Sequence, residues 1–192
     1  MSSVKTDKPA NILFVGVGGQ GIVLASDILA LAAMYSGYDV KKSEIHGMSQ
    51  RGGSVFAHVR FGKKVYSPMV AAGEADVIVS LEEMEALRWL GYSNDSTKII
   101  LVKARIIPAN AGAYPEGTEG FLRHEFRDVT ALDPSELAEK LGGPKFINVA
   151  ALGALSKYID VKPADVERAI RECVPRGSAE NNIEAFDFGR QI

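Results

Sequence analysis

Short apolar runs alternate along the chain with longer segments that have the length and composition of helices. The apolar or alternating runs predict strands at 11–15, 38–42, 75–81, 97–102 and 126–131. The longer segments predict helices at 21–34, 82–90, 134–142, 148–159, 163–174 and 178–192. Such alternation is typical of an α/β domain with a mainly parallel sheet.

Four details refine this prediction. Residues 54–67 alternate around Phe61-Gly62-Lys63-Lys64, which predicts a β-hairpin. The first helix is apolar nearly all round, so other elements must cover most of it. In segment 82–90 we expect the apolar side chains to point inward and the glutamates to complement the helix dipole of the first turn. Asp133 before Pro134 predicts an N-cap.

The expected fold is therefore α/β: a Rossmann-like three-layer domain with a mainly parallel sheet, a β-hairpin insertion after strand two and a helical C-terminus. Residues 1–10 are polar, and we expect them to form a disordered tail. The remainder, 11–192, is expected to form a single domain, which suits a chain that is 46% hydrophobic.

Composition narrows the classes of function. A net charge of −2 gives no general attraction to nucleic acid or to an anionic membrane. The apolar runs are too short to span a bilayer, and the first residues lack the apolar core of a signal peptide. A soluble cytoplasmic protein without nucleic-acid or membrane partners is the expectation.

Cysteine and histidine usage argues against metal chemistry in this chain. Cys173 is the only cysteine, so the chain cannot form an intrachain disulfide, and by itself it cannot hold an iron–sulfur cluster or a structural zinc. Its place in a helical segment favours a buried thiol over a reactive one. The three histidines show no metal-ligand spacing, so no metal site is expected.

A glycine-rich loop, Gly16–Gly21, follows the first predicted strand and opens the first predicted helix. The sequence GVGGQG matches the dinucleotide-binding pattern, in which glycines permit a tight turn and helix amides favour an anion. The acid expected about 20 residues later is missing, and Lys41-Lys42 stands there instead. This disfavours NAD and leaves three hypotheses: NADP, another anion or partner chain, or a packing turn without a ligand.

The stretch KSEIHGMSQRGGSV, residues 42–55, is unusually rich in functional groups. Between positions 41 and 64 one acid, Glu44, stands against six basic residues: Lys41, Lys42, Arg51, Arg60, Lys63 and Lys64. Such a surplus attracts phosphates, carboxylates or an acidic surface. We expect the last three to form a solvated face and Arg51, beside two glycines, to bind a ligand. Glu44 and His46 could form an acid–base pair, but no third group orients them, so self-contained catalysis is disfavoured.

Three stretches together resemble a known family. They are GVGGQGIVLASDILALAA, DVKKSEIHGMSQRGGSVFAHVRFG and VYSPMVAAGEADVIVSLEEMEALR. They are similar to the small (beta) subunit of indolepyruvate:ferredoxin oxidoreductase and, more broadly, to the gamma-type domain of the 2-oxoacid:ferredoxin oxidoreductase family. The resemblance extends from residue 11 to the C-terminus and includes NNIEAFDFG.

The resemblance implies a thiamine diphosphate- and iron–sulfur-dependent enzyme that decarboxylates a 2-oxoacid oxidatively, forms an acyl-CoA and passes electrons to ferredoxin. It implies that a large catalytic subunit carries thiamine diphosphate, magnesium and the clusters, and that coenzyme A is a co-substrate. In agreement, this chain has no GDG…NN motif. The chain is then inactive alone, binds none of the cofactors by itself, completes the assembly and helps bind coenzyme A.

The resemblance places the two functional stretches at the junction with the large subunit. The candidate contact positions are Gly18, Gly19, Gln20, Gly21, Ser43, Glu44, His46, Gln50, Arg51, Gly52 and Gly53. Gln50 and Arg51 are the leading candidates for contacting a phosphate or carboxylate. The alternatives are a stand-alone NADP-binding or other nucleotide-binding protein and a purely structural adaptor. Because the interface must be partly apolar, we also expect the isolated chain to form a homodimer.

Overall fold

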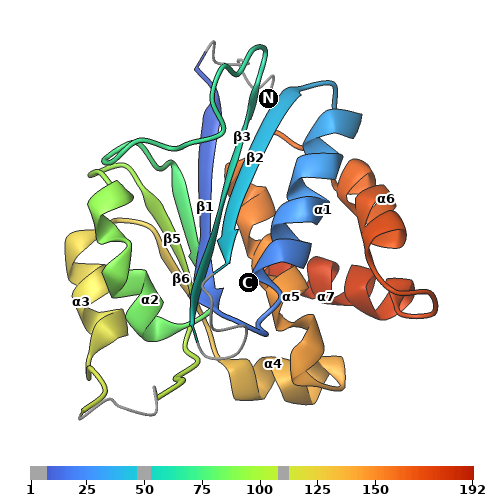
Figure 1. Ribbon diagram of the computed structural model, residues 1–192. Helices are drawn as coiled ribbons and strands as arrows, with labels where there is room; N and C mark the ends of the chain where they lie inside the picture. Colours follow the sequence, from blue (N-terminus) through green and yellow to red (C-terminus); the bar gives the residue numbers. More distant parts are fainter. Residues whose placement is uncertain (1–7, 47–52, 108–112) are drawn as a thin grey trace.

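The computed structural model describes residues 8–46, 53–107 and 113–192 (Figure 1). Its centre is a six-stranded sheet in the order β2-β3-β1-β4-β5-β6. The strands are β1 (Ala10–Val17), β2 (Asp39–His46), β3 (Ser54–Gly62), β4 (Val77–Ser80), β5 (Lys98–Val102) and β6 (Val129–Leu132). β3 runs antiparallel to both of its neighbours, whereas β1, β4, β5 and β6 pair in parallel. The predicted mainly parallel sheet is confirmed.

Helices cover both faces of the sheet, which gives the predicted three layers (Figure 1). They are α1 (Ile22–Tyr35), α2 (Glu83–Arg88), α3 (Thr118–Glu125), α4 (Pro134–Leu141), α5 (Ile147–Leu155), α6 (Pro163–Cys173) and α7 (Ala179–Gln191). α2 and α3 lie on one side of the sheet, and α1, α5, α6 and α7 lie on the other (Figure 1). Within the described ranges, no helix has both the length and the apolar character needed to cross a membrane.

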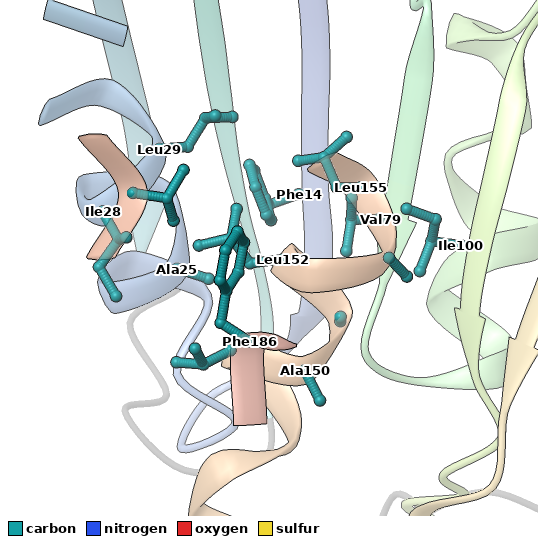
Figure 2. Packing of buried hydrophobic residues seen from close by; sticks show 14 of the residues in the cluster. Phe14, Ala25, Ile28, Leu29, Val79, Ile100, Ala150, Leu152, Leu155 and Phe186 are labelled. Atoms are coloured by element: carbon teal, nitrogen blue, oxygen red, sulfur yellow. The ribbon is translucent and has the colours of Figure 1, made fainter. Parts of the chain in front are cut away.

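The larger hydrophobic cluster lies between the sheet and α1 and α5 (Figure 2). Phe14 of β1, Leu29 of α1 and Phe186 of α7 meet there with no exposed surface. The apolar composition of α1 is thereby explained, because the sheet covers one of its sides and α6 packs against it from outside. A smaller cluster, which includes Leu13 and Val15, fills the space beneath α2.

α5 and α7 cross in close contact, and two glycines allow it. A Cβ atom on Gly153 would lie 2.1 Å from the carbonyl oxygen of Phe186, and one on Gly189 would lie 1.9 Å from that of Ala150. Real Cβ atoms essentially never come this close to another atom. Backbone therefore packs directly on backbone at this crossing.

The predicted hairpin within residues 54–67 is placed wrongly. Residues 54–62 form one uninterrupted strand, β3, which pairs antiparallel with β2 on one side and with β1 on the other. The alternating pattern identified a strand correctly, but it carries no information about which strand lies beside it. The insertion after strand two is β3 itself, which separates β2 from β1.

The start of α3 and the start of α4 can be compared with the sequence predictions. The sequence patterns assigned neither a strand nor a helix to residues 103–125, but α3 begins at Thr118, after Gly117 in the left-handed conformation (φ 74°). The predicted N-cap at Asp133 is confirmed, because its carboxylate accepts hydrogen bonds from the amides of Ser135 and Glu136. These bonds lower the pKa of Asp133.

Candidate functional site

The two stretches singled out by sequence meet at one edge of the sheet. The carboxyl ends of β1, β2, β4 and β5 share this edge, and β3 begins there. The backbone N–H of Gly18 donates a hydrogen bond to the carbonyl oxygen of Gly53 at 3.0 Å, which joins the glycine loop to the end of the second stretch. Open α/β sheets bind their ligands at this edge.

Gln20 occupies the inside of the glycine loop. Its Oε1 accepts a hydrogen bond from the amide of Val17 at 2.7 Å, and its Nε2 donates one to the carbonyl oxygen of Leu81 at 2.6 Å. The side chain thereby ties the loop to the residue that follows β4. Gly16 makes room for this arrangement, since a Cβ there would lie 2.7 Å from the same Oε1.

Two other glycines of the loop differ in their surroundings: Gly21 is closely packed and Gly19 is open. Gly21, the N-cap of α1 with φ 79°, leaves no room for a Cβ, which would lie 2.4 Å from Nδ2 of Asn148. Asn148 donates a hydrogen bond to the Gly21 carbonyl oxygen at 3.1 Å. Gly19 is exposed, with no atom within 4 Å of a built Cβ. Packing accounts for Gly16 and Gly21, and Gly19 leaves the backbone accessible.

Lys41 and Lys42, which kept a cofactor phosphate among the hypotheses, form ion pairs with acids of this chain. Nζ of Lys42 lies 2.5 Å from both Asp27 of α1 and Glu44 of β2. Nζ of Lys41 lies 2.8 Å from Asp39. The local positive charge is therefore largely balanced at this end of the stretch, which weakens the case for a nucleotide 2′-phosphate.

Three of the candidate positions lie on β2, and two of them are in the middle of the strand, away from the glycine loop. Ser43 pairs with His58 and Glu44 with Ala57, in the middle of the β2–β3 ladder. His46 is the last residue of β2. Gln50, Arg51 and Gly52 lie outside the described residues.

Arg60 was expected on a solvated face, and this prediction is wrong. Its Nε donates a hydrogen bond to Oδ1 of Asn11 at 2.7 Å. Its Nη1 donates to the carbonyl oxygens of Ser67 and Met69 at 3.0 and 3.1 Å. The guanidinium therefore fastens the connection after β3 to the sheet. Lys64, in contrast, is exposed as predicted.

Three glutamates that follow β4 are almost completely buried at the same edge. Glu82, Glu83 and Glu85 expose 1%, 4% and 4% of their surface. This burial was not predicted, because the inward face of segment 82–90 was assigned to apolar side chains. The run EEME by itself does not reveal the burial, because the partners of these acids are distant in sequence.

Glu82 binds two segments that are distant in sequence. Its carboxylate accepts hydrogen bonds from the amides of Glu85 and Ile106, at 2.9 and 3.1 Å, and from the hydroxyl of Tyr114. Burial and this carboxylate raise the pKa of the Tyr114 hydroxyl, which keeps it a donor. Nearby, Glu83 accepts a hydrogen bond from Nε of Arg105 at 3.1 Å.

Glu85 fixes the start of β3. Its Oε2 accepts hydrogen bonds from Oγ of Ser54 at 2.5 Å and from Nε1 of Trp89 at 3.1 Å, while Nε of Arg88 lies 3.0 Å from its Oε1. Ser54 directly follows Gly53, which binds the glycine loop. Glu82, Glu83 and Glu85 are called the Glu82–Glu85 cluster below. Their hydrogen bonds hold in place the chain segments that border this edge of the sheet.

The described side chains do not offer a metal or cluster site. In residues 8–46, 53–107 and 113–192, no group of three His, Cys, Asp or Glu side chains is arranged to hold a metal ion. Cys173 is partly buried at the end of α6, and burial, together with Asp27 and Glu172, raises the pKa of its thiol. One such thiol does not fit an iron–sulfur cluster, which requires several thiolates.

Comparison with known proteins decides the family. Residues 11–192 match the family described as pyruvate ferredoxin/flavodoxin oxidoreductase. The chain belongs to this family. It is 40% identical to the indolepyruvate oxidoreductase subunit IorB of Pyrococcus horikoshii, over 95% of each chain. It is 42% identical to the protein of that name in Archaeoglobus fulgidus, over 93% of this chain and 92% of the relative. The family resemblance expected from the sequence is confirmed.

More distant relatives and solved structures agree. A 2-oxoglutarate synthase subunit KorC of Methanothermobacter thermautotrophicus is 28% identical over 94% of this chain and 93% of the relative. The gamma subunit of a keto/oxoacid ferredoxin oxidoreductase of Geobacter sulfurreducens has a TM-score of 0.72 at 21% identity, with 95% of each chain covered. The 2-oxoglutarate:ferredoxin oxidoreductase of Magnetococcus marinus matches with a TM-score of 0.73 at 21% identity, over 97% of this chain and 31% of the larger chain. These structures share the α/β fold.

Proposed function

We propose that this chain is the small, gamma-type subunit of a cytoplasmic 2-oxoacid:ferredoxin oxidoreductase that acts on indolepyruvate or another aryl-pyruvate. The observation that carries the proposal is the near full-length similarity to the two indolepyruvate oxidoreductase subunits, at 40% and 42% identity. Identity to the 2-oxoglutarate synthase subunit is lower, at 28%, which favours the aromatic substrate class.

The complete enzyme decarboxylates the oxoacid oxidatively, transfers the acyl group to coenzyme A and passes two electrons to ferredoxin. Thiamine diphosphate, magnesium and the iron–sulfur clusters belong to a large partner subunit in this proposal, since one partly buried thiol cannot hold a cluster. This chain is inactive alone and contributes a surface that completes the site.

The contributed surface is the carboxyl edge of the sheet. Gly19 presents exposed backbone there, and Gly21, at the N-cap of α1, supplies no side-chain cap, so the first amides of α1 can face an anion. Gln50 and Arg51 belong to the segment that Gly53 ties to the glycine loop. We assign Arg51 to a phosphate of coenzyme A or to the carboxylate of the oxoacid, since a guanidinium binds both groups through paired hydrogen bonds.

The test is reconstitution with the large subunit, followed by steady-state kinetics with coenzyme A and the oxoacid varied in turn. Arg51→Ala removes a charge-assisted hydrogen bond worth about 1.5–3 kcal/mol. The kcat/KM for the ligand that Arg51 contacts should therefore fall about 10- to 150-fold. Arg51→Lys should recover part of the loss. Lys64→Ala, which removes an exposed lysine, is the matched control and should leave both parameters unchanged.

Two results would count against the proposal at different levels. Unchanged kinetics in Arg51→Ala would remove Arg51 from the site and leave an adaptor, an interpretation that the packing of Gly16 and Gly21 favours. Binding of NADPH by the isolated chain in calorimetry, without co-purification of a cysteine-rich large chain, would replace the proposed function by nucleotide binding.

A further inference from the structure

Strand β2 forms one edge of the sheet. Among the described residues it pairs with β3 alone, so its other side lacks a neighbouring strand. An open strand edge offers a row of backbone donors and acceptors to any other strand, and proteins usually block or occupy such edges. β2 spans eight residues without proline or glycine, and its Ile45 is 48% exposed.

The register of β2 sorts its side chains between the two faces of the sheet. Glu44 pairs with Ala57, and Ala57 belongs to the core on the α1 side. Lys42 lies on the same side, where it contacts Asp27 of α1. Because side chains alternate along a strand, positions 41, 43 and 45 face the α2 side.

A second copy of β2 can complete this edge only in certain registers. Opposite residues of an antiparallel pair share a face, so a two-fold axis perpendicular to the sheet must pass beside a residue that pairs with its own copy. An axis at Lys42 or Glu44 would place like charges opposite each other. An axis at Val40 would join Asp39 to Lys41, but it would overlap only three residues of β2.

An axis at Ser43 avoids these defects. Lys42 then lies opposite the partner's Glu44, and Glu44 lies opposite the partner's Lys42, on the α1 side. On the α2 side, the aliphatic stem of Lys41 lies against the partner's Ile45. The overlap extends from position 40 to position 46, nearly the whole of β2. The charge pattern of the strand is therefore self-complementary about Ser43.

We propose that β2 pairs antiparallel with β2 of a second copy of this chain, with the two-fold axis at Ser43, so that two six-stranded sheets become one continuous sheet. A two-fold interface uses the same surface on both copies, and it is the commonest symmetry of soluble oligomers. The proposal does not depend on the proposed function, since it concerns an edge away from the glycine loop.

Cysteine cross-linking reports the register directly. In a Cys173→Ala background, Ser43→Cys places two thiols beside the axis, with Cβ atoms about 4.5–5.5 Å apart, close to the geometry of a disulfide. Lys41→Cys is the matched control, because its two copies would lie four positions apart, about 13 Å at 3.3 Å per residue. We expect mild oxidation of the full chain to give a covalent dimer with Ser43→Cys and none with Lys41→Cys.

Light scattering supplies the second measurement. We expect a dimer for the unmodified chain. Glu44→Lys should associate about tenfold more weakly, because it places lysine opposite lysine at two positions across the axis. Circular dichroism should show that this variant remains folded. A monomer at every concentration would overturn the proposal. A dimer that cross-links through Lys41→Cys but not through Ser43→Cys would overturn it as well.

Discussion

Replacing Gly189 by alanine should destabilise the protein, although alanine is the better helix former. In an ordinary helix interior this change gains about 1 kcal/mol. Here the new Cβ would lie 1.9 Å from the carbonyl oxygen of Ala150 and 2.8 Å from its carbonyl carbon. Both are backbone atoms, so α5 and α7 must move apart. Overpacking costs about 1–3 kcal/mol, and the upper end applies because no side chain can rotate away.

The expected net loss is about 2 kcal/mol, which corresponds to about 4–8 °C in Tm at 2–4 °C per kcal/mol for a chain of this size. Denaturant unfolding followed by circular dichroism measures it. Gly120→Ala is the matched control, because Gly120 lies in α3 with no atom within 4 Å of a built Cβ. The control should be neutral or up to about 1 kcal/mol more stable. Equal effects of the two substitutions would refute the argument from close backbone packing.

Two further predictions concern buried polar groups. Glu85→Ala leaves the Ser54 hydroxyl and the Trp89 indole N–H without their acceptor. The unfolding free energy should therefore fall by about 2–6 kcal/mol, at about 1–3 kcal/mol for each of the two unpaired groups. Replacing the exposed Glu184 by alanine should not change it, and equal denaturation midpoints of the two variants would contradict the role of Glu85. His58 is fully buried, and burial followed by the Arg60 charge lowers its pKa below 6.5. As pH falls, the unfolded chain therefore takes up this proton before the folded protein does. His58 should thus reduce the unfolding free energy below about pH 6.5 and have no effect above it. His58→Asn should flatten that part of a stability–pH curve, and an unchanged slope would show that His58 does not titrate in this way.

Local patterns predicted most of the strands and helices, because each carries its own periodicity and boundary residues. The partner of β3 could not be predicted, since alternation in residues 54–62 fits any neighbouring strand. α3 was missed because it is short and begins among loop-forming residues, with Thr118 and Leu122 buried. Elements with little apolar surface leave little trace in the sequence.

The candidate site was predicted in part. The glycine loop and the end of the 42–55 stretch do meet, through Gly18 and Gly53. Arg60 and Glu85 were not assigned correctly, because their partners are distant in sequence: Asn11 and Ser67 for the first, Ser54 for the second. Charge counting treats such residues as solvated until the tertiary structure supplies a partner.

The Glu82–Glu85 cluster has a consequence for how the proposed assembly forms. Through Ser54 it fixes the start of β3, and through Ile106 and Tyr114 it fixes the chain beyond β5. These two segments are therefore already held in place when the chain has folded. A large subunit that docks on these segments meets a preorganised surface. Less conformational entropy is then lost on association than if the segments became ordered only in the complex.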